Sequence, residues 1–203
     1  MKKIASIAVM TVATLGLLCG CGDKEDVFTS QQTAIERYLT STRRMIAESE
    51  VGDVIENNPA FYTVHGHSAY RHIPNYYDDG RTDRTEIERG DSVCIAFNAY
   101  IFSGSEPTVS DVYWSNISTT INALSSQGGN ALARLDWSTD PLALKIGSTK
   151  IIRGLEQSLI GCREQDSVQV YMTYNMAYGN KLVGTVPKNS SVAWYIKILN
   201  VTK

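Results

Sequence analysis

The chain has 203 residues, of which 43% are hydrophobic and 20% are charged, and its formal net charge is −2. This composition is that of an ordinary globular protein with enough apolar residues for one core, and it excludes fibrous and largely disordered proteins. The near-neutral charge, with lysines and arginines scattered along the chain, also argues against a nucleic-acid partner.

The first twenty residues have the pattern of a bacterial secretion signal. Two lysines precede an apolar run over residues 4–18, which is short for a membrane span and typical of a signal-peptide core. A Leu-Cys-Gly-Cys sequence that ends at Cys21 follows, and it is similar to a bacterial lipobox. We therefore expect residues 1–20 to be a lipoprotein signal peptide, Cys21 to carry the lipid, and residues 21–30 to form a solvated tether. An uncleaved membrane anchor is the alternative.

Both interpretations place the protein in the cell envelope and on a membrane. The lipobox predicts a lipid anchor in the outer membrane of a Gram-negative bacterium. Acidic residues follow Cys21, as they do in some lipoproteins that are exported to the cell surface. A periplasmic and a surface-exposed location therefore both stay open.

Cysteine and histidine spacing gives no metal site. Cys94 and Cys162 remain in the body of the mature chain; they can form one disulfide outside the cytoplasm, but we favour two packed free thiols. His65 and His67 have no carboxylate or thiol partner at ligand spacing, so we expect them to be exposed or hydrogen-bonded.

Residues 31–85 predict a helix followed by a Tyr-rich extension. Apolar residues recur at helical spacing over residues 31–49, and Thr29 or Ser30 suits the start of the helix. We expect this amphipathic helix to pack on the globular domain; an arm for dimerisation or client contact is the alternative. Turn residues around 61–64 and 70–73 predict two short strands.

Alternating apolar residues then predict a sheet. Val93, Ile95, Phe97, Ala99 and Ile101 share one face of a strand, after a turn at residues 88–91. Three later runs also alternate, so we expect an antiparallel sheet with one buried face; the runs are residues 142–146, 168–172 and 192–198. Residues 151–159 give the one helical pattern of this region, with Gly161 placed to end it.

The order of these elements resembles that of the FKBP-type peptidyl-prolyl isomerases. Residues 141–199 read as a strand, an Ile-Ile-Arg-Gly helix, a strand, an Ala-Tyr-Gly loop and a strand, and the resemblance extends over about residues 89–201. It implies an α+β fold in residues 86–203, an FKBP-like curved antiparallel β-sheet wrapped over one short α-helix, behind an N-terminal helical extension. It also implies a monomeric prolyl isomerase that assists the folding of exported proteins, binds proline-containing polypeptides and needs no cofactor.

The resemblance also implies a pocket that binds the proline of the substrate. Tyr178 would supply a hydroxyl and Ile152 a backbone N–H that donates to the substrate carbonyl, so these two are the expected catalytic residues. The walls would come from substrate-binding residues on the strands, the helix entry and the loops: Phe97, Tyr113, Leu142, Ile151, Leu155, Ala177, Val186 and Trp194. The large apolar residues among them suit a core equally well.

Several positions depart from the family pattern. The family's Phe-Asp pair falls at Tyr113-Trp114, and the nearest carboxylate is that of Asp111, so the expected pocket aspartate is missing. Leu142 and Leu155 are smaller than the aromatic residues common at their positions, and an insertion over residues 115–139 borders the pocket. These departures support an alternative function, a binding or chaperone module of the same fold with weak or no isomerase activity.

Overall fold

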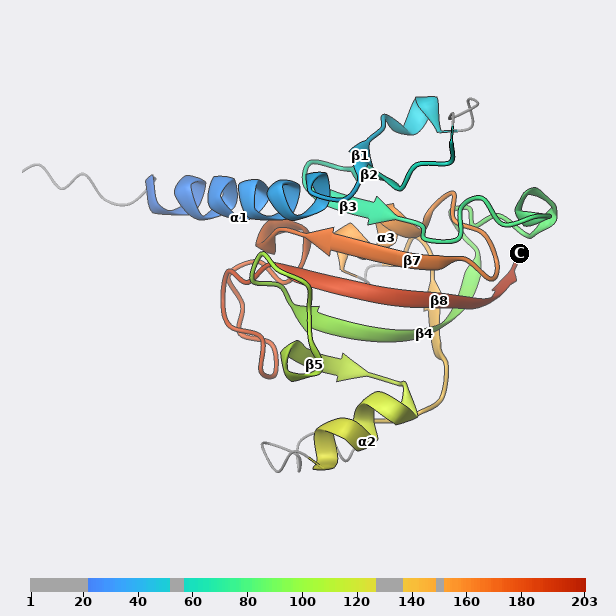
Figure 1. Ribbon diagram of the computed structural model, residues 1–203. Helices are drawn as coiled ribbons and strands as arrows, with labels where there is room; N and C mark the ends of the chain where they lie inside the picture. The colour runs from blue at the N-terminus through green and yellow to red at the C-terminus, as the bar shows by residue number, and fades with distance from the viewer. Residues whose placement is uncertain (1–21, 52–56, 127–136, 149–151) are drawn as a thin grey trace, which may run out of the picture.

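The computed structural model describes residues 22–51, 57–126, 137–148 and 152–203 (Figure 1). The predicted signal peptide, the lipid site at Cys21 and the pocket residue Ile151 lie outside these ranges. The described residues build one eight-stranded sheet with helices on both of its faces. Among them, no helix is both long enough and apolar enough to cross a membrane.

Two long antiparallel strands form the middle of the sheet. β4 (Ser92–Ile101) pairs along its whole length with β8 (Val192–Thr202). The neighbours on the β8 side are β7 (Ser167–Met172), then β3 (Ala69–His72), β2 (Phe61–His65) and, parallel to β2, β1 (Arg44–Met45). The other side of β4 is shared by two short strands, β5 (Val112–Ser115) and β6 (Leu142–Lys145).

The predicted alternation of β4 is confirmed. Val93, Ile95, Phe97 and Ala99 are at most 1% exposed and face the helix α3 (Arg153–Leu159). Leu155 and Leu159 of α3 pack into the same core, and burial of each such side chain stabilises the fold by about 1.5–3 kcal/mol. The sheet therefore curves over one short helix, and the predicted α+β fold class is confirmed.

Gly154 explains how closely the helix approaches the sheet. A Cβ atom at this position would lie 2.8 Å from Met172 Sδ and 3.0 Å from the Met176 carbonyl oxygen. Gly161, with φ +78°, follows the helix in the left-handed region, where a side chain is strained. Glycine at these two points thus fixes where α3 sits and where it ends.

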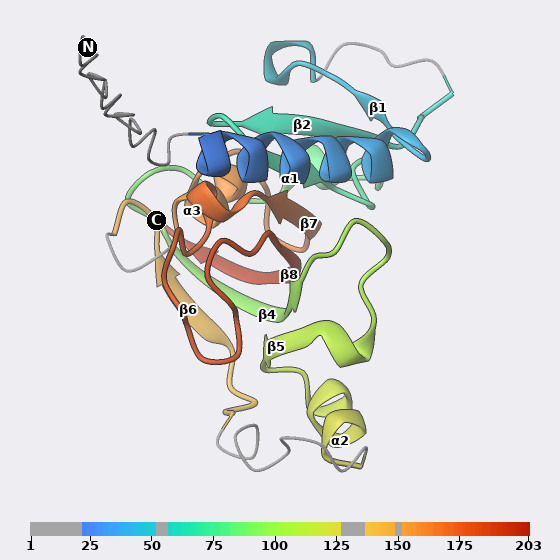
Figure 2. The same cartoon turned by 90° about the vertical axis from the view of Figure 1, so that its left-hand side faces the viewer.

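The expectation of a single buried face is wrong, because the opposite face of the sheet is also covered. The helix α1 (Gly22–Thr40) lies across it and buries Ile35 and Leu39 completely (Figure 2). The core beneath α1 contains five buried aromatic residues from β2, β3, β7, β4 and the residue after β4: Tyr62, Tyr70, Tyr171, Tyr100 and Phe102. Tyrosine is amphipathic, so these positions did not read as an apolar face in the sequence.

The boundaries of α1 also differ from the prediction of residues 31–49. The helix already begins at Gly22, within the segment expected to be a tether, and it ends at Thr40. Acidic Glu25 and Asp26 near its start suit the positive end of the helix dipole. Met45, within the range predicted as helix, instead lies in β1 and is 62% exposed.

Short helices occupy several connections. The insertion expected to border the pocket contains α2 (Ser118–Ser126), whose Leu124 is buried, and Figure 1 shows α2 beyond β5, at the edge of the sheet. Single 3₁₀ turns make up the rest: η1 (Glu48–Glu50), η2 (Arg81–Asp83), η3 (Val109–Asp111) and η5 (Tyr174–Met176).

The thiols and histidines of the described chain have structural surroundings. Cys94 and Cys162 are both free, as expected, and burial raises the pKa of Cys162 to about 11. His65 is 4% exposed and lies 2.6 Å from Thr63 Oγ1 through Nε2, whereas His67 is exposed. The described residues contain no group of three or more His, Cys, Asp or Glu side chains that could hold a metal ion.

Burial makes two histidines a source of acid sensitivity. Desolvation and the positive charge of Arg71 lower the pKa of His65 to about 3, although the exposed carboxylate of Glu48 lies 3.6 Å from its Nδ1. Desolvation and Arg43 lower the pKa of His72 to about 4, against the hydrogen bond to the Phe61 carbonyl. Both pKa values lie below the ordinary 6.5, so the unfolded chain binds protons that the folded chain does not.

We therefore expect the free energy of unfolding to be greatest above pH 6.5 and to fall as the pH drops from 6.5 towards 4 and then 3. Urea unfolding at a series of pH values measures this slope. His65→Gln and His72→Gln should each flatten it, whereas His67→Gln, at an exposed position, is the matched control. A slope that neither buried-site variant changes would contradict the assignment.

Candidate functional site

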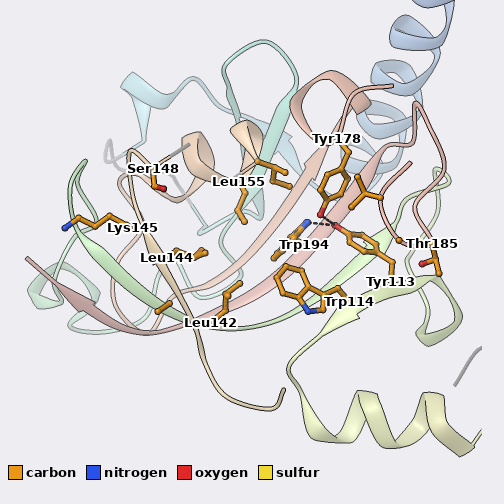
Figure 3. Close-up of a pocket in the computed structure, with 14 residues that line it drawn as sticks. Tyr113, Trp114, Leu142, Leu144, Lys145, Ser148, Leu155, Tyr178, Thr185 and Trp194 are labelled. Carbon is orange, nitrogen blue, oxygen red and sulfur yellow. Dashed lines mark hydrogen bonds between the residues drawn. The ribbon is translucent and has the colours of Figure 1, made fainter. Parts of the chain in front are cut away.

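A cavity of about 750 Å³ opens on the α3 side of the sheet (Figure 3). Its walls come from β5, β6, the entry of α3, β8 and the loop that joins β7 to β8. The lining residues are Tyr113, Trp114, Leu142, Ala143, Leu144, Lys145, Ser148, Ile152, Leu155, Tyr178, Val183, Gly184, Thr185 and Trp194. This volume lies within the range of small-ligand pockets, and the walls are mainly apolar.

A chain of three polar aromatic groups crosses one end of the cavity. The Trp194 indole Nε1–H donates to the Tyr113 hydroxyl oxygen over 2.8 Å, and the Tyr113 and Tyr178 hydroxyl oxygens lie 3.1 Å apart. Figure 3 shows the three side chains converging there, with Lys145 and Ser148 at the opposite end. The site thus has one polar end in an otherwise apolar cavity.

The hydroxyl hydrogens of the Trp194–Tyr113–Tyr178 hydrogen-bonded chain can be assigned to partners. One of the two tyrosine hydroxyls donates to the other, whichever way the pair is oriented, so one hydroxyl hydrogen of the pair stays free for a ligand. Burial raises the pKa of Tyr113 well above its usual range and also raises that of Tyr178. Both are therefore neutral near pH 7, and the chain offers a hydrogen-bond donor without a charge.

Aromatic stacking supports the base of the cavity. Phe97 stacks on Trp194 with ring centroids 4.8 Å apart and an interplanar angle of 22°. Trp114 packs edge-on against both rings, at 4.7 Å from Phe97 and 5.7 Å from Trp194. Phe97 is only 1% exposed and lies behind the lining, so it holds Trp194 in place rather than facing a ligand.

A β-bulge explains why two successive residues of β5 face the cavity. Ala99 pairs with Trp114 but Tyr100 pairs with Val112, which leaves Tyr113 as the extra residue. In a regular strand Tyr113 and Trp114 would point to opposite faces. The bulge turns both towards the cavity, where Trp114 lines the wall without filling the space.

The entry of α3 presents a backbone donor at the cavity wall. Ile152 is the N-cap residue, with φ −62° and ψ 138°, and its carbonyl accepts the N–H of Glu156 over 3.1 Å. Within the part of the chain that the structure describes, no acceptor is hydrogen-bonded to the N–H of Ile152. The first N–H groups of a helix have no partner inside the helix and are suited to an external carbonyl.

The β7–β8 loop brings Tyr178 and the flap to the cavity. Here the flap means residues 179–189. Val183 and Val186 form an antiparallel bridge with hydrogen bonds of 3.1 and 2.9 Å, and Val186 is 1% exposed while Leu182 is 66% exposed. Val186 thus anchors the flap to the core, and Val183, Gly184 and Thr185 form its cavity wall.

The structure places the expected pocket residues in three groups. Six of the ten line the cavity: Tyr113, Leu142, Ile152, Leu155, Tyr178 and Trp194. Phe97 and Val186 are buried in the adjacent core, and Ala177 packs against that core next to Tyr178. Ile151 lies outside the described residues.

Other lining residues were not predicted from the sequence. Leu144 shares the alternation of β6 with Leu142, so the same pattern could have indicated it. Trp114 was recognised only as the position of a missing aspartate. Lys145, Ser148, Val183 and Thr185 gave no pattern that distinguishes a pocket from a surface loop.

The cavity lining of the described chain contains no carboxylate, and Lys145 is its one charged residue. Asp111, the nearest candidate in the sequence, is committed elsewhere: its carboxylate accepts the backbone N–H and the hydroxyl of Thr108, each over 2.8 Å. Among residues 115–126 and 137–139, none lines the cavity, so the described part of the insertion does not cover it.

The helix-entry residues, the Tyr178 loop and the end strand of this cavity belong to one stretch of sequence. Residues 125–199 match the family model of the FKBP-type peptidyl-prolyl cis-trans isomerases. The matched FKBP segment contains β6, α3, β7 and most of β8, and thus every lining residue except Tyr113 and Trp114.

Among solved structures, the chain is similar to the crystal structure of the three FKBP domains of wheat FKBP73, with a TM-score of 0.48 and 16% sequence identity. The match covers 71% of this chain and 51% of that chain, so this chain spans about half the length of the wheat structure.

The hydroxyl of Tyr113 should have a measurable structural role. Tyr113→Phe leaves the indole N–H of Trp194, a residue only 2% exposed, without its acceptor. We expect a loss of about 1–3 kcal/mol in the free energy of unfolding, because an unpaired buried donor bears its full desolvation cost. Tyr178→Phe keeps the Trp194–Tyr113 bond and should cost less. Urea unfolding of both variants measures this. Equal losses of unfolding free energy would contradict the assignment of Tyr113, rather than Tyr178, as the acceptor of the Trp194 N–H.

Proposed function

We propose that the protein is an FKBP-type peptidyl-prolyl cis-trans isomerase that acts on exported proteins from a lipid anchor. One observation carries the enzymatic part: an apolar cavity with one free hydroxyl hydrogen lies almost entirely within the segment that matches the isomerase family. The family match supports isomerase chemistry in general, and the client and the location rest on the sequence patterns described above.

The reaction suits a site without acids, bases or metals. Rotation about a prolyl peptide bond breaks no covalent bond but loses the partial double-bond character of the C–N link, which gives a barrier of about 18–20 kcal/mol. Uncatalysed exchange takes about 10–100 s at 25 °C. Each tenfold acceleration requires that the transition state be favoured by about 1.4 kcal/mol over the ground state.

The cavity can supply this difference by desolvation. The planar amide is more polar than the twisted one, so transfer from water into an apolar cavity disfavours the ground state more. In the proposed complex the proline ring packs on the face of Trp194, between Leu155 and Tyr113. Because Phe97 stacks behind the indole, this surface is already rigid before a ligand arrives.

Two donors at the cavity wall can hold the carbonyl groups of the client. The N–H of Ile152 would donate to one carbonyl while the prolyl bond turns, and the free hydroxyl hydrogen of the Tyr113–Tyr178 pair would donate to another. Both donors are fixed by the fold, so the protein pays little reorganisation energy when the amide twists.

An isomerisation assay on the full chain in detergent tests this mechanism. The double variant Tyr113→Phe/Tyr178→Phe removes both hydroxyls and should lower kcat/KM about tenfold, the loss expected for one hydrogen bond. Tyr178→Phe alone should lose less, because it leaves the hydroxyl hydrogen of Tyr113 free to donate. Ile152→Pro removes the N–H donor at a position whose φ of −62° already suits proline, and should cost about tenfold beyond Ile152→Ala, which keeps the N–H. Tyr77→Phe is the control, because its hydroxyl contacts Pro59 away from the cavity.

A second candidate function is a binding module that retains the cavity but not the catalysis. Trp114 at the position of the family aspartate and the absence of a carboxylate from the described lining favour it. If a folded wild-type chain binds several Xaa-Pro peptides, seen as saturable quenching of tryptophan fluorescence, without exceeding the uncatalysed rate, the isomerase proposal fails and the binding module stands.

The envelope location has its own test. We propose that Cys21 is lipidated after removal of residues 1–20, on the basis of the Leu-Cys-Gly-Cys sequence. In a Gram-negative host, the wild-type chain should label with radioactive palmitate and partition with the outer membrane, and Cys21→Ser should lose both properties. Cys19→Ser should keep the label. Label on both variants would contradict the assignment.

A further inference from the structure

The N-terminal helix α1 reaches the loop that carries Tyr178. The Gln31 side chain of α1 makes two hydrogen bonds to backbone groups of the β7–β8 loop: its Nε2–H donates to the Asn189 carbonyl over 2.6 Å, and its Oε1 accepts the Tyr174 N–H over 2.9 Å. Tyr174 and Asn189 bracket the segment with Tyr178 and the flap. One side-chain amide thus links both ends of the loop that forms one wall of the cavity.

Two backbone bonds complete a closed ring with these contacts. The Asn189 N–H donates to the Gly179 carbonyl over 3.0 Å, and the Gly179 N–H donates to the Tyr174 carbonyl over 2.7 Å. The ring therefore runs from Gln31 to Asn189, Gly179, Tyr174 and back to Gln31. Gly179 directly follows Tyr178, so the ring fixes the backbone from which that hydroxyl projects.

The ring has a rigid support on the α1 side. Gln31 shares a helix face with Ile35 and Leu39, four and eight residues later, and both are completely buried against the sheet. Tyr70 adds a hydrogen bond of 2.9 Å from its hydroxyl to Glu36. Docking of α1 therefore sets the position of Gln31, because all these contacts belong to one helix.

The loop is also fixed just beyond the ring. The Phe102 N–H donates to the Ser191 carbonyl over 2.9 Å, and the Ser191 hydroxyl donates to the Phe102 carbonyl over 2.8 Å. These bonds hold the start of β8 and lie beyond the C-terminal end of the ring. On this side of the loop, Gln31 supplies the side-chain bonds that close the base of the loop.

We propose that Gln31 is a positioning residue for the cavity, and that the docked helix α1 is part of the machinery that holds Tyr178 and the flap over a bound polypeptide. The catalytic consequence rests on the proposed isomerase function, but the ordering of the loop does not. Loss of the Gln31 amide opens the ring at two points and leaves α1 docked through Ile35 and Leu39.

Amide hydrogen exchange followed by NMR on the full chain in detergent tests the ring without any assay of activity. In Gln31→Ala the amides of Tyr174, Gly179 and Asn189 should exchange about tenfold faster, which corresponds to about 1.4 kcal/mol. Amides of β4 should be unchanged. Gln32→Ala is the matched control, because the Gln32 amide hydrogen-bonds to Glu36 over 3.3 Å and interacts with Tyr70, neither of which belongs to the β7–β8 loop.

A second variant separates the two halves of the ring. Gln31→Glu keeps an acceptor for the Tyr174 N–H but places a carboxylate oxygen against the Asn189 carbonyl. The Tyr174 amide should stay protected while the Asn189 amide exchanges faster. Faster exchange throughout the sheet in Gln31→Ala, or wild-type exchange at all three loop amides, would overturn the proposal.

The same variants link the ring to catalysis. Gln31→Ala should lower kcat/KM for an Xaa-Pro peptide about three- to tenfold through KM rather than kcat, because the loop must be ordered by the ligand. Gln32→Ala should not. If the wild-type chain has no isomerase activity, the proposed function fails while the exchange data still decide the role of Gln31. If loop exchange changes but kcat/KM does not, the ring is structural only and the positioning role is overturned.

Discussion

Along its whole length β4 is hydrogen-bonded to β8, with one register shift between Cys94 and Ile95. The register beyond that shift sets Ala99 opposite Trp194 and Tyr100 opposite Ala193. Because side chains alternate between the two faces of a strand, this pairing sends Trp194 towards α3 and Tyr195 towards α1. A slip by one residue would exchange the two faces. The cavity would lose its indole wall, and α1 would lose its tyrosine surface, at the same time.

The neutral polar chain at the cavity end is consistent with the absence of a carboxylate. A carboxylate buried without a cationic partner has a desolvation cost of several kcal/mol, and the described lining offers only Lys145, at the far end of the cavity. The Trp194–Tyr113–Tyr178 chain avoids this cost because all three groups are uncharged and are joined by hydrogen bonds. It still presents a donor to a carbonyl, and neighbouring hydrogen bonds polarise that donor.

Much of the fold could be predicted from the sequence, because apolar alternation is a direct signal of a buried strand face. The alternation of Val93 to Ala99 predicted β4, and the Ile-Ile-Arg-Gly entry predicted α3. The second buried face was missed because it is made largely of tyrosine, which suits surfaces and cores alike. The early start of α1 was missed because its first turns are polar, so no apolar periodicity marks them.

The residues of the site likewise fall into those that the sequence could locate and those that it could not. Residues that line the cavity as large apolar groups in regular elements, such as Leu155 and Trp194, could be located from pattern and resemblance. The bulge that turns Tyr113 and Trp114 to one side is a property of strand pairing, which the sequence of β5 does not record. Gln31 was also missed, because a polar side chain that bonds to the backbone of a distant loop leaves no periodic signal.

The two faces of the sheet meet at the β7–β8 loop, since α1 contacts both of its ends while its middle lines the cavity. Its ends are held by Gln31 from one face, while Val186 and Tyr178 pack on the other. A loop of this length closed only by its own backbone would sample many conformations, and ordering it on binding would reduce affinity. Contacts from α1 order the loop when the protein folds, so the entropy cost of ordering it does not reduce the affinity for a ligand. The N-terminal helix is therefore not separable from the cavity in energetic terms, even though it lies on the opposite face.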